Sequence, residues 1–350
     1  MNDLSRRGWL AGTATCLIAG GAAPMIRTTR KTPMPIHQFA GHRDAPVFSL
    51  GFSPDGRLLA SGGGDRSALI WDIPDRRLVK RIDHPSAVYG ACFTAKGDLL
   101  VTGCYDAVVR SWKVGPFERV EAFPKEPKSR GLNKLVVSPR DGRIFSAEPG
   151  FFAPIARDLG GGTATPLHFP GDLWPKPLVE GLSISVDGSR LAAAHLSGVV
   201  TVWDAQSLAL VGKLSIAGAG FISVAHDPGG KTFAAGSSAL VGAATTTGID
   251  IWDAQTLRHV RRINGLRDSP YSLTYSADGR HLLYYGSSED VPLNQLVVWS
   301  VATAEVVSRT EHVYHGCQTS AVSPDGRLLA TGTNTGQILL WDLAEILKDG

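Results

Sequence analysis

One run of residues occurs twice in this chain, almost unchanged, near its two ends. Residues 53–73 read SPDGRLLASGGGDRSALIWDI, and residues 323–343 read SPDGRLLATGTNTGQILLWDL. Two near-copies so far apart predict further copies between them, because self-similarity at a fixed spacing is the mark of a repeat architecture. The repetition therefore constrains the fold more strongly than composition does.

Weaker copies fill the intervening chain, at residues 94–114, 138–159, 185–205, 227–254 and 276–301. A tryptophan occupies the same position in six copies, and Arg157 lies near that position in the copy at 138–159, which matches the repeat poorly. Successive markers are 41 to 49 residues apart. Seven units of about 45 residues account for the whole stretch from 33 to 350. The six marking residues are Trp71, Trp112, Trp203, Trp252, Trp299 and Trp341.

Each unit has the pattern of a small antiparallel sheet. In the first unit, Val47–Phe52 is a short apolar strand, and residues 53–56 (SPDG) form a type I turn in which proline fixes φ at the second position. Further strands are predicted at 58–61, 68–72 and 78–82. Each unit is therefore expected to be a four-stranded antiparallel sheet.

Seven such sheets predict an all-β fold, a seven-bladed β-propeller. A single sheet would expose two apolar faces, and stacking the sheets around a circle covers both faces and removes the open ends. Residues 36–40 (IHQFA) have the character of a strand that precedes the first blade. We expect them to pair with residues 338–341 and to close the ring, because an unpaired edge is a liability.

These motifs resemble those of the WD-repeat β-propellers, over residues 33–345. The resemblance rests on Gly-His, Ser-Pro-Asp-Gly, a Ser or Thr, an Asp and Trp-Asp at consistent spacing. It implies a hydrogen-bond network in each well-formed blade. The third blade scarcely matches the motif, and the fourth has Ala193 and Ser197 in place of the Ser and Asp. The implied network residues are His42, Ser61, Asp65 and Trp71; His84, Thr102, Asp106 and Trp112; and His312, Thr331 and Trp341, with Thr335 where Asp would stand.

A histidine, an acid and a hydroxyl also make up a nucleophilic triad. The same trio recurs here at equivalent positions of two blades, each time with a tryptophan. Repetition together with the repeat favours a structural role over a catalytic one.

The first 32 residues have the layout of an export signal. Arg6 and Arg7 precede an apolar stretch of small residues that ends in Gly21-Ala22-Ala23, and the paired arginines resemble a bacterial twin-arginine signal. The stretch is too weakly apolar to predict a stable membrane span. Export to the periplasm or cell envelope is therefore expected, with a cytoplasmic tail as the alternative; lipidation at Cys16 is disfavoured. Residues 346–350 are expected to form a C-terminal tail.

Charge and composition argue against several kinds of partner. The net charge is +3, and residues 1–32 carry five basic residues against Asp3, so the rest of the chain has a net charge of −1. That balance does not predict nucleic-acid binding. The cysteines are too widely spaced for a zinc site and are expected to be reduced, and no phosphate-binding loop is present in the sequence. No metal or other cofactor is expected.

Four long connections predict a partner site on one face of the disc. They lie at 148–155, 169–180, 236–248 and 287–294. Loops on a rigid scaffold often carry recognition, and exposed aromatic residues anchor interfaces. The alternative is that Phe151 and Phe152 fill out the poorly formed third blade. The candidate partner-binding residues are Phe151, Phe152, Trp174, Glu289 and Asp290.

The sequence therefore favours a monomeric, non-catalytic scaffold that binds a protein or peptide. One alternative is an exported hydrolase or lactonase-like enzyme with a site in the central channel. Such a site needs polar residues that converge from the innermost strands, whereas residues 47–52, 88–93 and 319–322 are mainly small and apolar. A second alternative is a purely structural component of the cell envelope.

Overall fold

Strands in every repeat follow from the alternation of short apolar runs and tight turns. The structure is a computed structural model that describes residues 33–350, apart from 152, 162–163, 169–177, 239–245, 265, 267–268, 288–294, 311–315 and 349–350. Over the described residues, the chain forms seven four-stranded antiparallel sheets, as predicted.

The strands of each sheet follow one another along the chain, except in the seventh sheet. Blade 1 contains β2 (Val47–Phe52), β3 (Leu58–Gly63), β4 (Ser67–Asp72) and β5 (Arg77–Asp83), and blade 2 contains β6 (Val88–Phe93), β7 (Leu99–Cys104), β8 (Val109–Lys113) and β9 (Glu118–Phe123). Blade 3 contains β10 (Lys134–Val137), β11 (Ile144–Ala147), β12 (Ile155–Arg157) and β13 (Ala164–Pro166). Blade 4 contains β14 (Val179–Ile184), β15 (Arg190–His195), β16 (Val199–Asp204) and β17 (Leu210–Ser215).

The remaining blades complete the set. Blade 5 contains β18 (Phe221–His226), β19 (Thr232–Ser237), β20 (Gly248–Asp253) and β21 (His259–Ile263), and blade 6 contains β22 (Ser269–Tyr275), β23 (His281–Ser287), β24 (Gln295–Ser300) and β25 (Val306–Arg309). Blade 7 contains β26 (Cys317–Val322), β27 (Leu328–Thr333), β28 (Gln337–Asp342) and β1 (His37–Ala40).

The turn after each inner strand is held by its own side chains. Gly56 N–H donates to Ser53 O at 2.8 Å, and Leu58 N–H donates to Ser53 Oγ at 2.9 Å. Gly56 has φ of 72°, in the left-handed region that favours glycine. Ser53 Oγ also donates to Asp55 Oδ1 at 2.6 Å. The equivalent serine-to-aspartate bond, also at 2.6 Å, occurs after the inner strands of blades 4, 6 and 7. This repeated turn reverses the chain between the first two strands of a blade.

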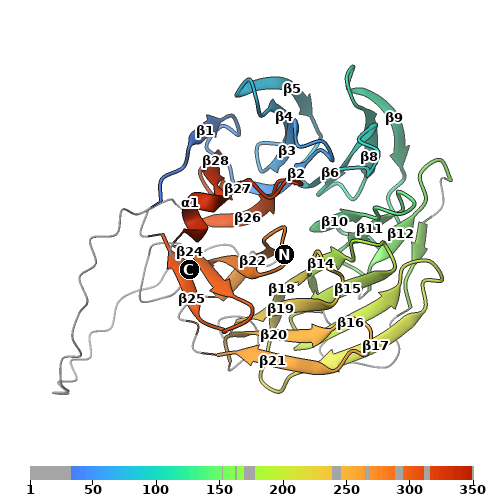
Figure 1. The fold of residues 1–350 in the computed structure, drawn as a ribbon. Coiled ribbons are helices and arrows are strands. Elements are labelled where there is room, and N and C mark those ends of the chain that lie inside the picture. Colours follow the sequence, from blue (N-terminus) through green and yellow to red (C-terminus); the bar gives the residue numbers. More distant parts are fainter. Residues whose placement is uncertain are drawn as a thin grey trace, which may run out of the picture. The chain divides into compact units, whose positions relative to one another are not determined.

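The seven inner strands lie around the centre of the ring, and the blades radiate outward from it (Figure 1). Neighbouring inner strands contact one another all the way around, and β26 contacts β2 where the ring closes. The predicted closure is confirmed: β1 pairs with β28 in antiparallel register, with His37 opposite Leu340 and Ala40 opposite Gln337. The N-terminal strand therefore supplies the outer strand of the last blade.

The core consists of seven apolar layers, one between each pair of neighbouring blades, among the residues that the structure describes. Between blades 1 and 2, for example, Ile70 packs with Val88 and Leu100, all fully buried. Each blade therefore depends on both neighbours for the burial of its faces.

A short helix follows the last strand. α1 (Leu343–Leu347) begins at Asp342, whose side chain accepts bonds from the backbone N–H groups of Ala344 and Glu345. Ile346 is 1% exposed and packs into the layer between blades 6 and 7. The structure thus differs from the expectation of a tail at 346–350, because Ile346 carries apolar surface that this layer buries.

Candidate binding site at a channel mouth

The first blade contains the four residues of the expected network in mutual contact. The fully buried His42 has Nε2 2.7 Å from Ser61 Oγ and Nδ1 2.8 Å from Asp65 Oδ1. The Trp71 indole N–H donates to the same serine oxygen at 3.0 Å. Burial acts to raise the pKa of Asp65, but its hydrogen bonds, that from His42 foremost, lower it to about 2. These side chains bind one another and line neither of the cavities described below, which is the geometry of a structural network.

The second blade keeps part of this network. His84 Nε2 lies 2.9 Å from Thr102 Oγ1, to which the Trp112 indole N–H also donates at 2.8 Å. The structure differs from the expectation at Asp106, which pairs with Arg110 at 2.7 Å, while His84 Nδ1 faces a backbone carbonyl. Arg110 offers Asp106 a permanent positive charge four residues along the chain, and the histidine does not.

The seventh blade shows the tryptophan contact again. The Trp341 indole N–H donates to Thr331 Oγ1 at 3.0 Å. Thr335, which stands where the network aspartate would be, lies 3.1 Å from Thr333 through the two hydroxyl oxygens. His312 lies outside the described residues.

The third blade replaces the tryptophan by a buried ion pair. Arg157 lies opposite Ile144, as Trp71 lies opposite Leu59 in the first blade. Arg157 Nη1 donates to Ser146 Oγ at 2.6 Å, and Nη2 lies 2.7 Å from Glu148 Oε1; both charged side chains are fully buried. An arginine therefore takes the place of the indole donor, and its carboxylate partner Glu148 was not predicted from the sequence.

A β-bulge recurs near the start of the inner strands. In six blades the second or third residue of the inner strand has no paired residue on the second strand, and we call it the skipped residue. A bulge leaves its extra residue unpaired and redirects the side chain. Five of the skipped residues have described side chains, and all five line one cavity: Phe48, Tyr89, Glu180, Ile222 and Tyr271.

That cavity measures about 380 Å³ and is completed by Asn133, Lys134 and Leu196. The rings of Phe48 and Tyr89 stack, with centroids 4.3 Å apart and planes 7° apart. Tyr105 continues this aromatic row away from the channel, 5.9 Å from Tyr89. Apolar and aromatic walls with a few polar groups are typical of ligand-binding cavities.

Two opposite charges share this cavity. Burial lowers the pKa of Lys134, and the nearby Glu180 carboxylate opposes that change. Burial likewise raises the pKa of Glu180, opposed by Lys134. The inner-strand residues that counted against a polar site in the sequence, 47–52, 88–93 and 319–322, belong to blades 1, 2 and 7. The polar residues of this cavity come from blades 3 and 4 instead: Lys134 on β10, Asn133 just before it, and Glu180 on β14.

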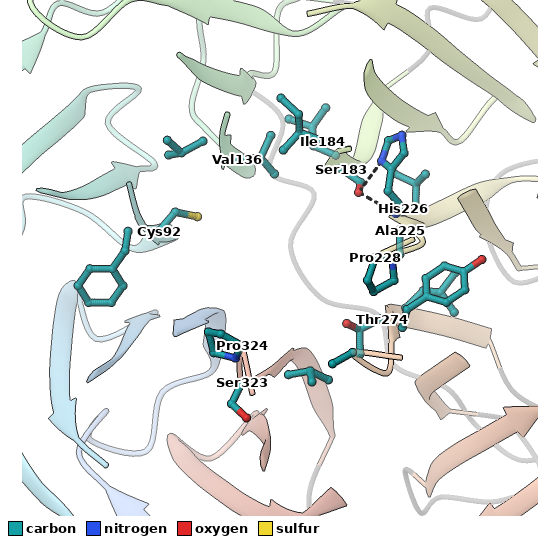
Figure 2. A pocket seen from close by; sticks show the side chains of 18 residues that line it. Cys92, Val136, Ser183, Ile184, Ala225, His226, Pro228, Thr274, Ser323 and Pro324 are labelled. Carbon is teal, nitrogen blue, oxygen red and sulfur yellow. Dashed lines mark hydrogen bonds between the residues drawn. The ribbon is translucent and has the colours of Figure 1, made fainter. Parts of the chain in front are cut away.

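The opposite mouth of the channel forms a second cavity, of about 580 Å³, beside the turns that follow the inner strands (Figure 2). Ser183 Oγ lies 2.9 Å from His226 Nδ1 and accepts a bond from the His226 backbone N–H at 3.0 Å. Burial lowers the pKa of His226 to about 4, so the imidazole is neutral near neutral pH. His226 Nε2 has no hydrogen-bond partner within the described part of the chain. The pair joins blades 4 and 5 and lacks the carboxylate that orients the histidine of a nucleophilic triad.

Four of the five predicted partner-binding residues lie outside the described part of the chain: Phe152, Trp174, Glu289 and Asp290. Phe151 is half-buried in the turn after Glu148, and its backbone N–H donates to Glu148 O at 3.0 Å. This turn joins the second and third strands of its blade, so it lies on the same face of the disc as the cavity that contains Phe48.

Among the described residues, no helix is long and apolar enough to cross a membrane. Nor do three or more His, Cys, Asp or Glu side chains gather there as potential metal ligands.

A closed ring of seven four-stranded sheets defines a β-propeller, and three of its blades contain a contact between a tryptophan indole N–H and a Ser or Thr hydroxyl. Three segments, residues 33–72, 76–113 and 307–342, match the protein-family model described as "WD domain, G-beta repeat". The matched segments include the first three strands of blades 1, 2 and 7, in which the tryptophan donates to a Ser or Thr hydroxyl.

Curated relatives match 23% to 32% of the chain. Jouberin of Rattus norvegicus is 37% identical over 82 residues, which are 23% of this chain and 8% of that protein. Transcription initiation factor TFIID subunit 5 of Caenorhabditis elegans is 33% identical over 86 residues, 25% of this chain and 13% of the relative. Protein HIR1 of Candida albicans is 32% identical over 129 residues, 32% of this chain. The matches span 8% to 13% of these relatives' own length.

Proposed function

We propose that this protein is a non-catalytic scaffold that binds a protein or peptide partner across the channel mouth lined by Phe48 and Tyr89. The observation that carries the proposal is the repeated β-bulge, which brings aromatic side chains from three different blades to one opening. A rigid ring that presents several aromatic rings at one opening provides the kind of anchor on which interfaces depend.

Exposure of the aromatic rings supports this choice of face. Tyr105 is 51% exposed and Tyr271 is 38% exposed, although large aromatic side chains are usually buried. The connections that are longest in the sequence begin or end on the same face. A partner segment that lies across this mouth would cover these rings and remove their apolar surface from water.

The test is a comparison of partners captured by matched variants. The bait is the full chain, incubated with an extract of its native cells, and bound proteins are identified by mass spectrometry. The mouth variant carries Tyr89→Ser, Tyr105→Ser and Tyr271→Ser. The control variant carries Val120→Ser and Val260→Ser, which replace side chains that are 59% and 58% exposed on the outer strands β9 and β21. Both variants are first checked for an unchanged melting temperature.

We expect a partner that the wild type and the control variant retain and that the mouth variant loses. Because truncation of interface anchors costs about 2 kcal/mol or more each, three such changes reduce affinity by well over about a hundredfold. Equal retention by the mouth variant would contradict the proposal.

We also propose that residues 1–32 direct export through the paired Arg6 and Arg7. Arg6→Lys and Arg7→Lys together keep the charge and remove the arginine pair, so we expect the protein to stay in the cytoplasm of its native cells. Arg27→Lys with Arg30→Lys is the matched control. Cell fractionation followed by immunoblotting measures the result, and unchanged export of the Arg6/Arg7 variant would overturn the proposal.

A further inference from the structure

Lys134 is unusual for its place in the repeat. It stands four residues before the Ser of the turn that follows its inner strand, and the corresponding residues of the other six blades are small: Ser49, Gly90, Gly181, Ser223, Ser272 and Thr319.

The small residues have a visible structural reason. A Cβ on Gly90 would lie 2.5 Å from Leu135 Cβ of the next blade, so space is short there. Where the residue is serine, the hydroxyl bonds to the neighbouring inner strand, as Ser223 Oγ does to Pro270 O at 2.6 Å. In blade 3 that link is made by Asn133 instead, whose Nδ2 donates to Val179 O at 3.0 Å. Lys134 is thereby released from this linking role.

The amine-bearing side chain of Lys134 lines the 380 Å³ cavity together with Glu180 and the aromatic rings. The side chain is half-buried, so its surroundings remove water without closing it off from a ligand. Neither residue forms an ion pair within 4 Å among the described residues. An amine and a carboxyl group therefore face the same small, apolar space without neutralising each other by direct contact.

We propose that Lys134 is a covalent carbonyl-binding site, at which an aromatic aldehyde stacks against Tyr89 and forms an imine with the Lys134 amine. The site goes beyond the scaffold function and does not require the protein partner. Planar, apolar ligands suit the stacked rings of Phe48 and Tyr89. The volume of the cavity limits the ligand to a small molecule or one side chain.

The reaction needs a nucleophilic amine and a proton donor. The Lys134 nitrogen attacks the carbonyl carbon, a C–N bond forms, and a proton moves from nitrogen to oxygen to give a carbinolamine. Glu180 in its protonated form then donates a proton to the hydroxyl group, the C–O bond breaks, and water leaves. The remaining N–H proton returns to the Glu180 carboxylate, so that one amine and one aldehyde give one neutral imine and one water.

The electrostatics of the cavity favour both roles. Burial lowers the pKa of Lys134, which increases the fraction of neutral, nucleophilic amine near neutral pH. Burial raises the pKa of Glu180, which increases the fraction of protonated acid. An exposed lysine, in contrast, is almost wholly protonated at that pH.

The experiment uses 2-naphthaldehyde as the probe, with sodium cyanoborohydride to reduce any imine to a stable amine. The full chain is treated at about pH 7 and the labelled lysines are mapped by peptide mass spectrometry. Lys80 and Lys96, both exposed, are internal controls in the same molecule. We expect Lys134 to be labelled roughly severalfold faster than either control, since a lowered pKa leaves a larger fraction of the amine neutral at this pH.

Further arms separate this site from general lysine reactivity. The pH at which labelling of Lys134 is half-maximal should lie below that for the exposed control lysines, because burial lowers the pKa of Lys134. Acetaldehyde, which has no ring to stack, should lose the preference for Lys134. Glu180→Gln should slow labelling at Lys134 and leave Lys96 unchanged, and a melting temperature checks that this variant folds. Labelling of Lys134 no faster than Lys80 and Lys96, with the same pH profile, would overturn the proposal, and this outcome is independent of any partner captured by the scaffold.

Discussion

A single position shows how this ring tolerates the loss of its marker residue. Arg157 donates to Ser146 as Trp71 donates to Ser61, but a buried arginine requires a countercharge, which Glu148 supplies. Burying two charges costs much of what their attraction returns, whereas removal of one partner leaves the other charge without compensation. Because an ion pair replaces the indole, the stability of blade 3 depends on both Arg157 and Glu148.

This dependence predicts opposite outcomes for single and double substitutions. Arg157→Met leaves the Glu148 charge buried alone and should lower the free energy of unfolding by about 3–5 kcal/mol. The double variant Arg157→Met/Glu148→Met removes both charges and should recover most of that loss. Urea unfolding measures the effect. Arg110→Met breaks the pair with Asp106, whose two side chains are 11% and 21% exposed and so are less buried than Arg157 and Glu148; it is the control, with an expected loss of about 1 kcal/mol. A double variant less stable than Arg157→Met would show that the pair is not the source of the loss.

At the scale of the strand, the sequence predicted what depends on local chemistry. Turns with the sequence Ser-Pro-Asp-Gly and the short apolar runs between turns depend on neighbouring residues, so the number and order of the strands were predictable. The bulges were not, because a skipped pair depends on how two strands meet. The mouth residues Phe48 and Tyr89 were therefore passed over inside runs that look apolar. A signal was available: each skipped residue stands five positions before the residue that opens the next turn.

The candidate site was predicted less well than the fold for the same reason. Loop length pointed to one face of the disc, and the cavity with exposed tyrosines lies on that face. Lys134 and Glu180 belong to neighbouring blades and come together because the inner strands β10 and β14 pack side by side. Composition and spacing along one strand cannot show such a convergence, because it depends on tertiary packing.

At the scale of the whole molecule, closure of the ring depends on one noncovalent seam. In blades 1 to 6 the outer strand follows its neighbour along the chain, but in blade 7 the outer strand β1 comes from the other end of the chain. Phe39 of β1 is 3% exposed and lies against Trp71 of blade 1, with ring centroids 4.8 Å apart. This side chain therefore anchors both the last blade and its contact with the first.

Phe39→Ala should loosen the seam as well as lower stability. Loss of a buried phenylalanine costs about 3–5 kcal/mol, and here nothing covalent holds β1 beside β28. Hydrogen exchange followed by mass spectrometry should then show faster exchange over residues 337–342 under native conditions. Phe123→Ala is the matched control: Phe123 is 1% exposed on the outer strand of blade 2, which continues directly from its neighbour in the chain. That variant should lose comparable stability and leave exchange at 337–342 unchanged. If both variants speed exchange there equally, closure of the ring does not depend on the β1 seam.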